Sequence, residues 1–194
     1  MKIDISSRLI LLAAGNQTRF IPDVPKCLCE IHGETVLSRL TRRFDMGRPI
    51  VVAPAWWKRS YVETAQLLGD VVTVQPGLTP GHSISAGLKH CETHAGLVIS
   101  ADIVIPNNTE IRIPRGLKWA LYDPWEMITI YVLGCGIGTR QHCEKYCSDD
   151  RVEYMLHANM PIDLFRSGWI NVNTPADLAR AHALCQEENS AAVK

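Results

Sequence analysis

The chain has 194 residues, of which 46% are hydrophobic; this is enough for one sizeable core and short for several domains. Twenty basic and twenty acidic residues give a formal net charge of zero, and because the basic residues are scattered, the sequence argues against a nucleic-acid partner. No apolar run reaches membrane-spanning length, which argues against a membrane location, and seven cysteines without the spacing of a disulfide framework favour a reducing cytoplasm.

The first predicted element is a strand over residues 9–14, an apolar run without polar alternation that stops at Gly15. Glycine has no Cβ, so the loop that follows can bring its backbone N–H groups close to a phosphate. Arg19 and Lys26 then supply a planar guanidinium and a compact ammonium, which together suit the oxygens of a triphosphate. This stretch predicts a phosphate-binding loop.

Strands and helices alternate along the rest of the chain. Apolar side chains at helical spacing predict one helix over residues 35–45 and a second that begins just after Ser83 and runs to about residue 91. Further strands are predicted at five apolar runs: residues 50–53, 71–74, 97–99, 117–121 and 127–133. This alternation predicts an α/β protein with a mostly parallel sheet.

The corner between residues 75 and 83 is rich in proline and glycine and leads into the second predicted helix. A helix start carries free N–H groups and a partial positive charge, so this corner can hold part of a nucleotide. Gln75, Gly81 and Ser83 are the polar or small residues available there, and Ser83 is expected to cap the helix. Capping and base binding are compatible roles.

Asp102 follows the predicted strand at residues 97–99, at the carboxyl end of that strand. Ligands of open α/β sheets bind at this edge, where Gly15 also ends a strand. A carboxylate is a natural hard ligand for Mg²⁺, although an aspartate that caps a turn is the alternative that the residues themselves leave open.

Two later stretches are interpreted as structural. Residues 134–138 contain three glycines, but the third is one position early for a dinucleotide fingerprint, which leaves a structural bend or a turn that serves an acceptor pocket. Cys143 and Cys147 lie four residues apart, as packed side chains on one helix face do, and they lack the CxxC pair of a zinc site.

A last helix is predicted from residue 175, because Thr174, Pro175 and Asp177 fit the N-cap, the first helical position and a capping box. Upstream, Asn171 and Asn173 alternate with apolar residues, which places both on one face of a short strand. From residue 187 the chain is polar and expected to fray, so one domain is predicted over residues 1–186 with a tail at 187–194.

Three segments carry a family resemblance: Leu11-Leu12-Ala13-Ala14-Gly15 with Arg19 and Pro25-Lys26, residues 81–88 with 96–106, and residues 169–178. In this order they resemble the nucleotidyltransferases of the GT-A-like α/β fold, and most closely the group of molybdenum-cofactor guanylyl- and cytidylyltransferases (MobA-like NTP transferases). Residues 107–168 match nothing specific. The resemblance implies a single-domain, Rossmann-like three-layer α/β/α sandwich with a mostly parallel mixed sheet, as in nucleotide-diphospho-sugar transferases.

The same resemblance implies a Mg²⁺-dependent enzyme that transfers NMP from an NTP to a phosphorylated small-molecule acceptor and releases pyrophosphate. It implies catalytic roles for Arg19 and Lys26 and a metal site at Asp102, Asn171 and Asn173. The implied nucleotide-binding residues are Leu12, Ala13, Ala14, Gly15, Gln75, Gly81 and Ser83.

Several alternatives stay open. The acceptor can be a sugar 1-phosphate, a polyol phosphate or phosphocholine, and the unmatched stretch 107–168 allows a non-catalytic nucleotide-binding homologue. The residues offered for base binding serve guanine or cytosine alike. The sequence does not give the oligomeric state.

Overall fold

The computed structural model describes residues 7–15, 24–75, 79–107, 109, 119–123, 128–146 and 168–191. Their centre is a six-stranded sheet in the order β5-β4-β1-β6-β9-β8. The strands are β1 (Ser7–Leu12), β4 (Ile50–Pro54), β5 (Asp70–Val74), β6 (Ala95–Ser100), β8 (Trp119–Asp123) and β9 (Ile128–Gly134). Each apolar run expected to form a strand does so, within two residues at either end.

The sheet is mixed but mostly parallel, as predicted. β5, β4, β1 and β6 run parallel, while β9 pairs antiparallel with both β6 and β8. The chain starts in the middle at β1, moves outward to β4 and β5, and then returns to the other side of β1 with β6. This reversal makes the carboxyl ends of β1 and β6 the switch point at which such sheets bind ligands.

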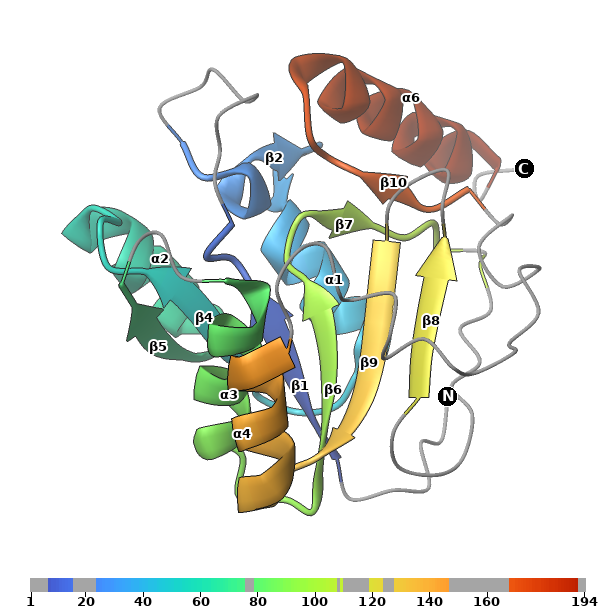
Figure 1. Cartoon of the computed structure of the whole chain (residues 1–194). Helices are drawn as coiled ribbons and strands as arrows, with labels where there is room; N and C mark the ends of the chain where they lie inside the picture. The colour runs from blue at the N-terminus through green and yellow to red at the C-terminus, as the bar shows by residue number, and fades with distance from the viewer. Residues whose placement is uncertain are drawn as a thin grey trace.

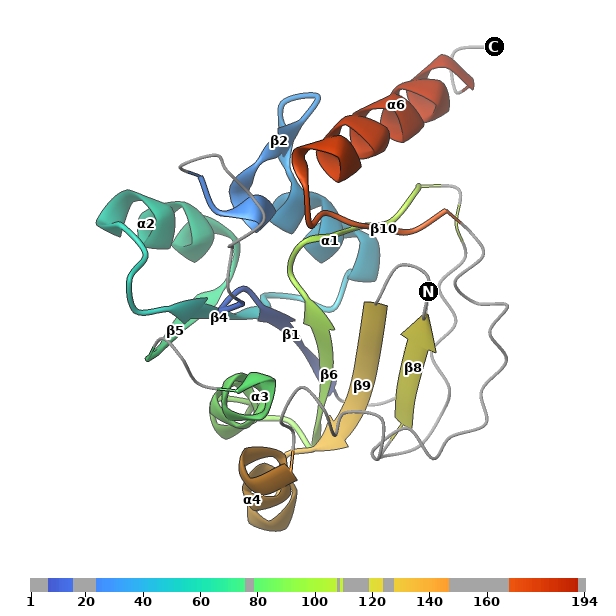
Figure 2. The same ribbon diagram turned by 45° about the horizontal axis from the view of Figure 1, so that its top comes forward.

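Helices cover both faces of the sheet (Figures 1 and 2). On one face, Leu9 and Leu11 belong to the same buried core cluster as residues of α1 (Val36–Phe44) and α2 (Arg59–Leu68). On the other face, Ile10 packs with α3 (Pro80–Lys89) and α4 (Ile137–Tyr146). The alternation of β1 side chains between two helical layers confirms the three-layer α/β/α sandwich.

A smaller unit sits above the carboxyl edge of the sheet. It consists of η1 (Lys26–Leu28), β2 (Glu30–Ile31), β3 (Glu34–Thr35), β7 (Ile103–Val104), β10 (Ile170–Asn171) and α6 (Pro175–Ala191). β10 pairs antiparallel with β7, which directly follows Asp102, and the N–H of Val172 donates to the carbonyl of Asp102 at 2.9 Å. The C-terminal part of the chain therefore reaches the edge of the sheet where Asp102 lies.

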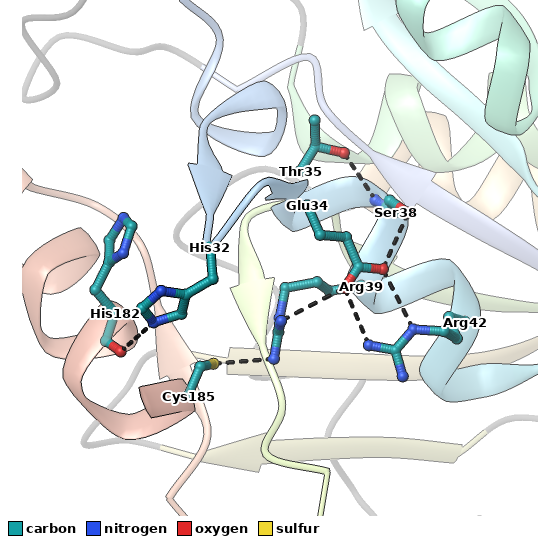
Figure 3. A network of polar contacts seen from close by, with 8 residues as sticks. All are labelled: His32, Glu34, Thr35, Ser38, Arg39, Arg42, His182 and Cys185. Carbon is teal, nitrogen blue, oxygen red and sulfur yellow. Dashed lines mark hydrogen bonds and ion pairs between the residues drawn. The ribbon is translucent and has the colours of Figure 1, made fainter. Parts of the chain in front are cut away.

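Side-chain contacts join α6 to the β2–β3 turn and to α1 (Figure 3). The His32 ring nitrogen Nε2 lies 2.9 Å from the carbonyl oxygen of His182, and Arg39 Nη2 donates to Cys185 Sγ at 3.0 Å. His32 and Gly33 form the turn between β2 and β3 with φ angles of 51° and 80°, the left-handed conformation of a tight hairpin turn. Both contacts join α6 to residues more than 140 positions earlier in the chain.

The capping prediction for Ser83 is wrong. α3 begins at Pro80 with Thr79 as its N-cap residue, and Ser83 is a buried residue inside the helix. Proline is favoured at the first helical position, where its missing N–H is not needed, and this sets the start of the helix earlier.

At the other end of the chain, the predicted capping box of α6 is confirmed. The N–H of Asp177 donates to Thr174 Oγ1 at 3.2 Å, and the N–H of Thr174 donates to Asp177 Oδ2 at 2.9 Å. The boundary expected at residue 187 falls within α6, which continues to Ala191.

α3 and α4 also pack against each other. Ser85 Oγ on α3 donates to Glu144 Oε1 on α4 at 2.7 Å, and Cys143 is fully buried in the core between the helices and the sheet. Cys143 is thus a packing residue, as interpreted from sequence, whereas Cys147 lies outside the described residues. Among the described helices, none has the length and apolar character needed to cross a membrane.

Candidate active site

A small cavity opens at the switch point of the sheet. Its walls come from the end of β1, from η1 and from the end of β6: Leu12, Ala13, Gly15, Lys26, Cys27, Ser100, Ala101 and Asp102. Backbone hydrogen bonds hold these ends together, because the N–H of Ala101 donates to the carbonyl of Leu12 at 2.9 Å and that of Ala13 to Val52 at 2.8 Å. Residues predicted from two separate motifs thus share one cavity: Leu12, Ala13, Gly15 and Lys26 come from the first motif, and Asp102 comes from the strand at residues 97–99.

Lys26 lies at the centre of the polar contacts. Its ammonium Nζ donates to Asp102 Oδ2 at 3.3 Å and to Asn173 Oδ1 at 3.0 Å. The Lys26 and Asp102 side chains are only 11% and 17% exposed, so this ion pair is largely withdrawn from water. A carboxylate oxygen and an amide oxygen, from residues 71 positions apart, therefore converge on one cation.

Asp102 has a second partner, Ser100, whose hydroxyl donates to Oδ1. The two carboxylate oxygens thus have different partners, Ser100 on one side and Lys26 on the other. Ser100 was not among the residues predicted for the site. Its position could have indicated it, because it is a hydroxyl residue at the end of a buried strand, two residues before Asp102.

Asn173 is positioned by the start of α6. Its backbone N–H donates to Asp177 Oδ2 at 3.1 Å and to the carbonyl of Asn171 at 3.0 Å. The capping box therefore has a second consequence, because it fixes the residue that presents an amide oxygen to Lys26. Asn171 lies on β10, where it pairs with Ile103 of β7, and its side chain is partly buried.

Cys27 also lines the cavity, but its thiol is not suited to act as a nucleophile. Burial raises the pKa of Cys27 far above its usual value, and the negative charge of Asp102 raises it further. Burial likewise raises the pKa of Cys29. The thiolate is the reactive form of cysteine, so both side chains stay protonated and inert at neutral pH.

Other predicted residues lie away from this cavity. Ala14 is partly buried and packs toward the α3 and α4 side of the sheet. Gln75 is exposed directly after β5, and Gly81 and Ser83 are buried in α3. Arg19 lies outside the described residues. The structure therefore brings together the residues predicted at the end of β1 with Lys26, Asp102 and Asn173. Gln75, after β5, and Gly81 and Ser83, in α3, do not line the cavity.

Comparison with known families agrees with this arrangement. Residues 9–112, more than half of the chain, match the model of the MobA-like NTP transferase domain. The chain belongs to this family. The part of the NTP transferase that the family model matches includes Lys26 and Asp102, whereas Asn173 lies beyond it.

Solved structures show the same fold at low sequence identity. HddC from Yersinia pseudotuberculosis, in complex with GMP-PN, is 16% identical and has a TM-score of 0.56, with 91% of this chain and 98% of that chain covered. A putative glucose-1-phosphate thymidylyltransferase from Bacillus anthracis is 11% identical with a TM-score of 0.63, covering 93% and 96%. The inositol-1-phosphate CTP transferase from T. maritima is 14% identical with a TM-score of 0.55, covering 95% and 97%. None of the curated proteins matches the chain.

These findings confirm the predicted family and fold class. The chain is an NTP transferase domain with the Rossmann-like fold that nucleotidyltransferases share, and its cavity lies at the sheet edge where this class of fold binds ligands.

Proposed function

We propose that this NTP transferase is a Mg²⁺-dependent enzyme that transfers NMP from an NTP to a phosphorylated small-molecule acceptor and releases pyrophosphate. The observation that carries the proposal is the convergence of Lys26, Asp102 and Asn173 at the switch-point cavity of a MobA-like domain. Such a cluster offers a cation for phosphates and oxygen ligands for a metal.

The oxygen donors fit a magnesium ion. Mg²⁺ prefers hard oxygen ligands such as carboxylates and is commonly bound through one or two of them together with substrate phosphates. Asp102 Oδ2 and Asn173 Oδ1 already face a common cation, the Lys26 ammonium, at 3.3 and 3.0 Å. We assign Asp102 and Asn173 as metal-holding residues, with Asn171 as a further candidate on the adjacent strand. When bound, the metal would neutralise phosphate charge.

The remaining chemistry concerns positioning. An oxygen of the acceptor phosphate forms a bond to the α-phosphorus of the NTP, while the bond from that phosphorus to the oxygen of the leaving pyrophosphate breaks. Lys26 and Arg19 would bind the triphosphate oxygens and stabilise the charge that the leaving group gains. The loop at Leu12, Ala13, Ala14 and Gly15 would supply backbone contacts. No covalent enzyme intermediate is required, in agreement with the inert Cys27.

We place the nucleoside between this cavity and the start of α3, where Gln75, Gly81 and Ser83 would contact the base. The carboxyl ends of β4 and β5 lie beside β1 on that side of the sheet. The similar solved structures include proteins described as thymidylyl and CTP transferases that act on a sugar phosphate and an inositol phosphate. From the resemblance to the MobA-like group we propose a guanine or cytosine nucleotide as the donor, with sugar 1-phosphates, polyol phosphates and phosphocholine as alternative acceptors.

A second candidate function is a homologue that binds nucleotide without catalysis. The family match ends at residue 112, and the stretch 107–168 matches no specific motif of the resembling family. Catalysis needs an acceptor site as well as a nucleotide site. Because the stretch 107–168 matches no specific motif, turnover has to be tested separately from nucleotide binding.

The test uses the full chain with Mg²⁺ and each of the four ribonucleoside triphosphates. A ligand present at about 100 times its dissociation constant stabilises a protein by ~2.7 kcal/mol, which a thermal-shift measurement detects. Pyrophosphate release with a panel of phosphorylated acceptors then separates the two functions. Release with one acceptor supports the enzyme, binding without release from any acceptor supports the second candidate, and the absence of NTP binding contradicts both.

We expect the enzyme to work in the cytoplasm. The six cysteines within the described part of the chain are not joined in disulfides, which is the usual state in a reducing compartment.

A further inference from the structure

We propose that Ser100 is a positioning residue that fixes the orientation of the Asp102 carboxylate toward the metal. This inference rests on the proposed metal site of the enzyme. Ser100 would act through Asp102 and would touch neither the nucleotide nor the acceptor.

The backbone on both sides of Asp102 is already fixed. Ser100 pairs in register with Leu12 of β1, and the N–H of Ala101 donates to the carbonyl of Leu12 at 2.9 Å. The carbonyl of Asp102 itself accepts from Val172 at 2.9 Å. The torsions of the Asp102 side chain are therefore its main remaining freedom.

That freedom matters because the last torsion of an aspartate has a broad energy profile. Rotation about it exchanges Oδ1 and Oδ2 or turns both away from a ligand. The Ser100 hydroxyl donates to Oδ1, and Oδ2 faces Lys26. A hydrogen bond to one oxygen thus determines where the other oxygen points.

A hydroxyl suits this role for an electrostatic reason. A lysine or arginine in the same place would neutralise the carboxylate and compete with a metal for it, whereas a neutral donor leaves the negative charge available. The bond is also on the oxygen that Lys26 does not use. The carboxylate can therefore keep one orientation when phosphates draw Lys26 away and a metal takes its place.

The test measures Mn²⁺ binding to the full chain by electron paramagnetic resonance, with a saturating non-hydrolysable analogue of GTP or CTP present, because Lys26 contacts Asp102 and Asn173 in the free protein. Mn²⁺ is a spectroscopic probe for a Mg²⁺ site. Partners that orient metal ligands typically contribute about 10- to 100-fold in metal affinity, so Ser100→Ala should weaken Mn²⁺ binding by roughly this factor. Ser100→Thr, which keeps the hydroxyl, should bind Mn²⁺ within about twofold of the wild type.

Ser85→Ala is the matched control. Ser85 is buried and its hydroxyl donates to the carboxylate of Glu144, but it lies on the α4-facing side of α3 and does not line the cavity. Its removal should leave Mn²⁺ affinity unchanged. If Ser100→Ala does not fold, Ser100→Cys preserves the size of the side chain with a much weaker donor and should still show weakened binding.

The outcomes separate this inference from the proposed function. Mn²⁺ affinity unchanged in folded Ser100→Ala or Ser100→Cys overturns the positioning role while leaving the metal site intact. Equal loss in Ser100→Ala and Ser100→Thr also overturns it, since a packing role would give that result. If the wild type binds no Mn²⁺, or if Asp102→Asn binds Mn²⁺ as tightly as the wild type, both the metal site and this inference are overturned.

Discussion

Lys26 provides the positive charge that balances Asp102 in a largely buried site. Its ammonium is held by Asp102 and Asn173, at the place where we expect a metal when nucleotide is bound. Lys26 therefore has two roles in this account: it pairs with Asp102 in the free protein and binds phosphates in the complex. A substitution that keeps the apolar stem but removes the charge tests both roles.

Lys26→Met should reduce turnover by roughly 10²- to 10³-fold, the usual loss when one donor to a transition-state charge is removed. Mg²⁺ binding without nucleotide should become tighter, because the ammonium no longer competes for Asp102. Steady-state kinetics and calorimetric metal titration measure the two effects. Lys89→Met, at the exposed end of α3, is the control and should change neither quantity. Normal turnover in Lys26→Met would argue against the phosphate role.

At the scale of elements, the start of α6 serves both stability and the site. Asp177 accepts hydrogen bonds from the N–H groups of Thr174 and Asn173, and Asn173 in turn contacts Lys26. The capping box of α6 therefore also positions the amide oxygen that Asn173 presents to Lys26 in the candidate active site. The helix also contacts His32 in the β2–β3 turn and Arg39 on α1 (Figure 3).

Thr174→Ala should lower the free energy of unfolding by about 1 kcal/mol, the typical cost of losing an N-cap side chain. Urea denaturation measures this change. Thr64→Ala is a suitable control, because Thr64 is exposed in the interior of α2 and its hydroxyl donates to the carbonyl of Ser60 one turn earlier. It should shift the free energy of unfolding by no more than about 0.5 kcal/mol. Equal effects of the two substitutions would contradict a capping role for Thr174.

At the scale of the whole molecule, a polar network around Glu34 links β3, α1 and the C-terminal helix α6. The Glu34 carboxylate accepts hydrogen bonds from the Ser38 hydroxyl at 3.1 Å and from the Arg42 guanidinium at 3.1 and 3.2 Å (Figure 3). Arg39 Nη1 donates to Glu34 Oε2 at 3.4 Å, and Arg39 Nη2 donates to Cys185 on α6. Burial alone would raise the pKa of Glu34, but the hydrogen bonds from Arg42 and Ser38 and the nearby arginine charges hold it below its usual range.

This shift has a definite consequence for acid stability. Because the pKa of Glu34 is lower in the folded than in the unfolded state, its ionised carboxylate stabilises the fold. This stabilisation is fully present above the pKa of Glu34 in the unfolded chain, about 4.3, and is lost as the pH falls through the pKa of Glu34 in the folded protein. The free energy of unfolding should therefore decrease on acidification below about pH 5, and less steeply in Glu34→Gln than in the wild type. Urea denaturation between pH 6 and 3 measures the slopes. Glu63→Gln, at an exposed position, should follow the wild type. Parallel curves for wild type and Glu34→Gln would contradict the role of this network.

The sequence predicted the sheet well for a physical reason. Strands buried on both faces leave nearly continuous apolar runs, as in β1, β4 and β6, and these can be recognised without any tertiary information. Because the ends of parallel strands meet at one edge, the proximity of Gly15 and Asp102 was predictable too.

Other features of the fold and the site depend on the tertiary structure and could not be predicted from the sequence. The order of the strands follows from how the helices pack, and the start of α3 was misplaced because Pro80 moved it upstream of Ser83. The contacts of Lys26 with Asn173 and of Ser100 with Asp102 require backbone positions accurate to within an ångström. The roles of all the predicted site residues, Lys26 and Asp102 included, stay predictions.

The measurement that tests the central claim most directly is the Mg²⁺ dependence of turnover in Asp102→Asn beside the wild type. Asparagine keeps the shape of aspartate but removes the charge that holds a hard cation, so turnover should collapse and added Mg²⁺ should restore little of it. Nucleotide binding without metal should be unchanged or tighter, because a carboxylate near phosphates repels them when no cation lies between. If Asp102 only caps a turn, asparagine caps equally well, and the mutant would keep both its stability and an unchanged Mg²⁺ dependence. That result would remove Asp102 from the metal site and contradict the account.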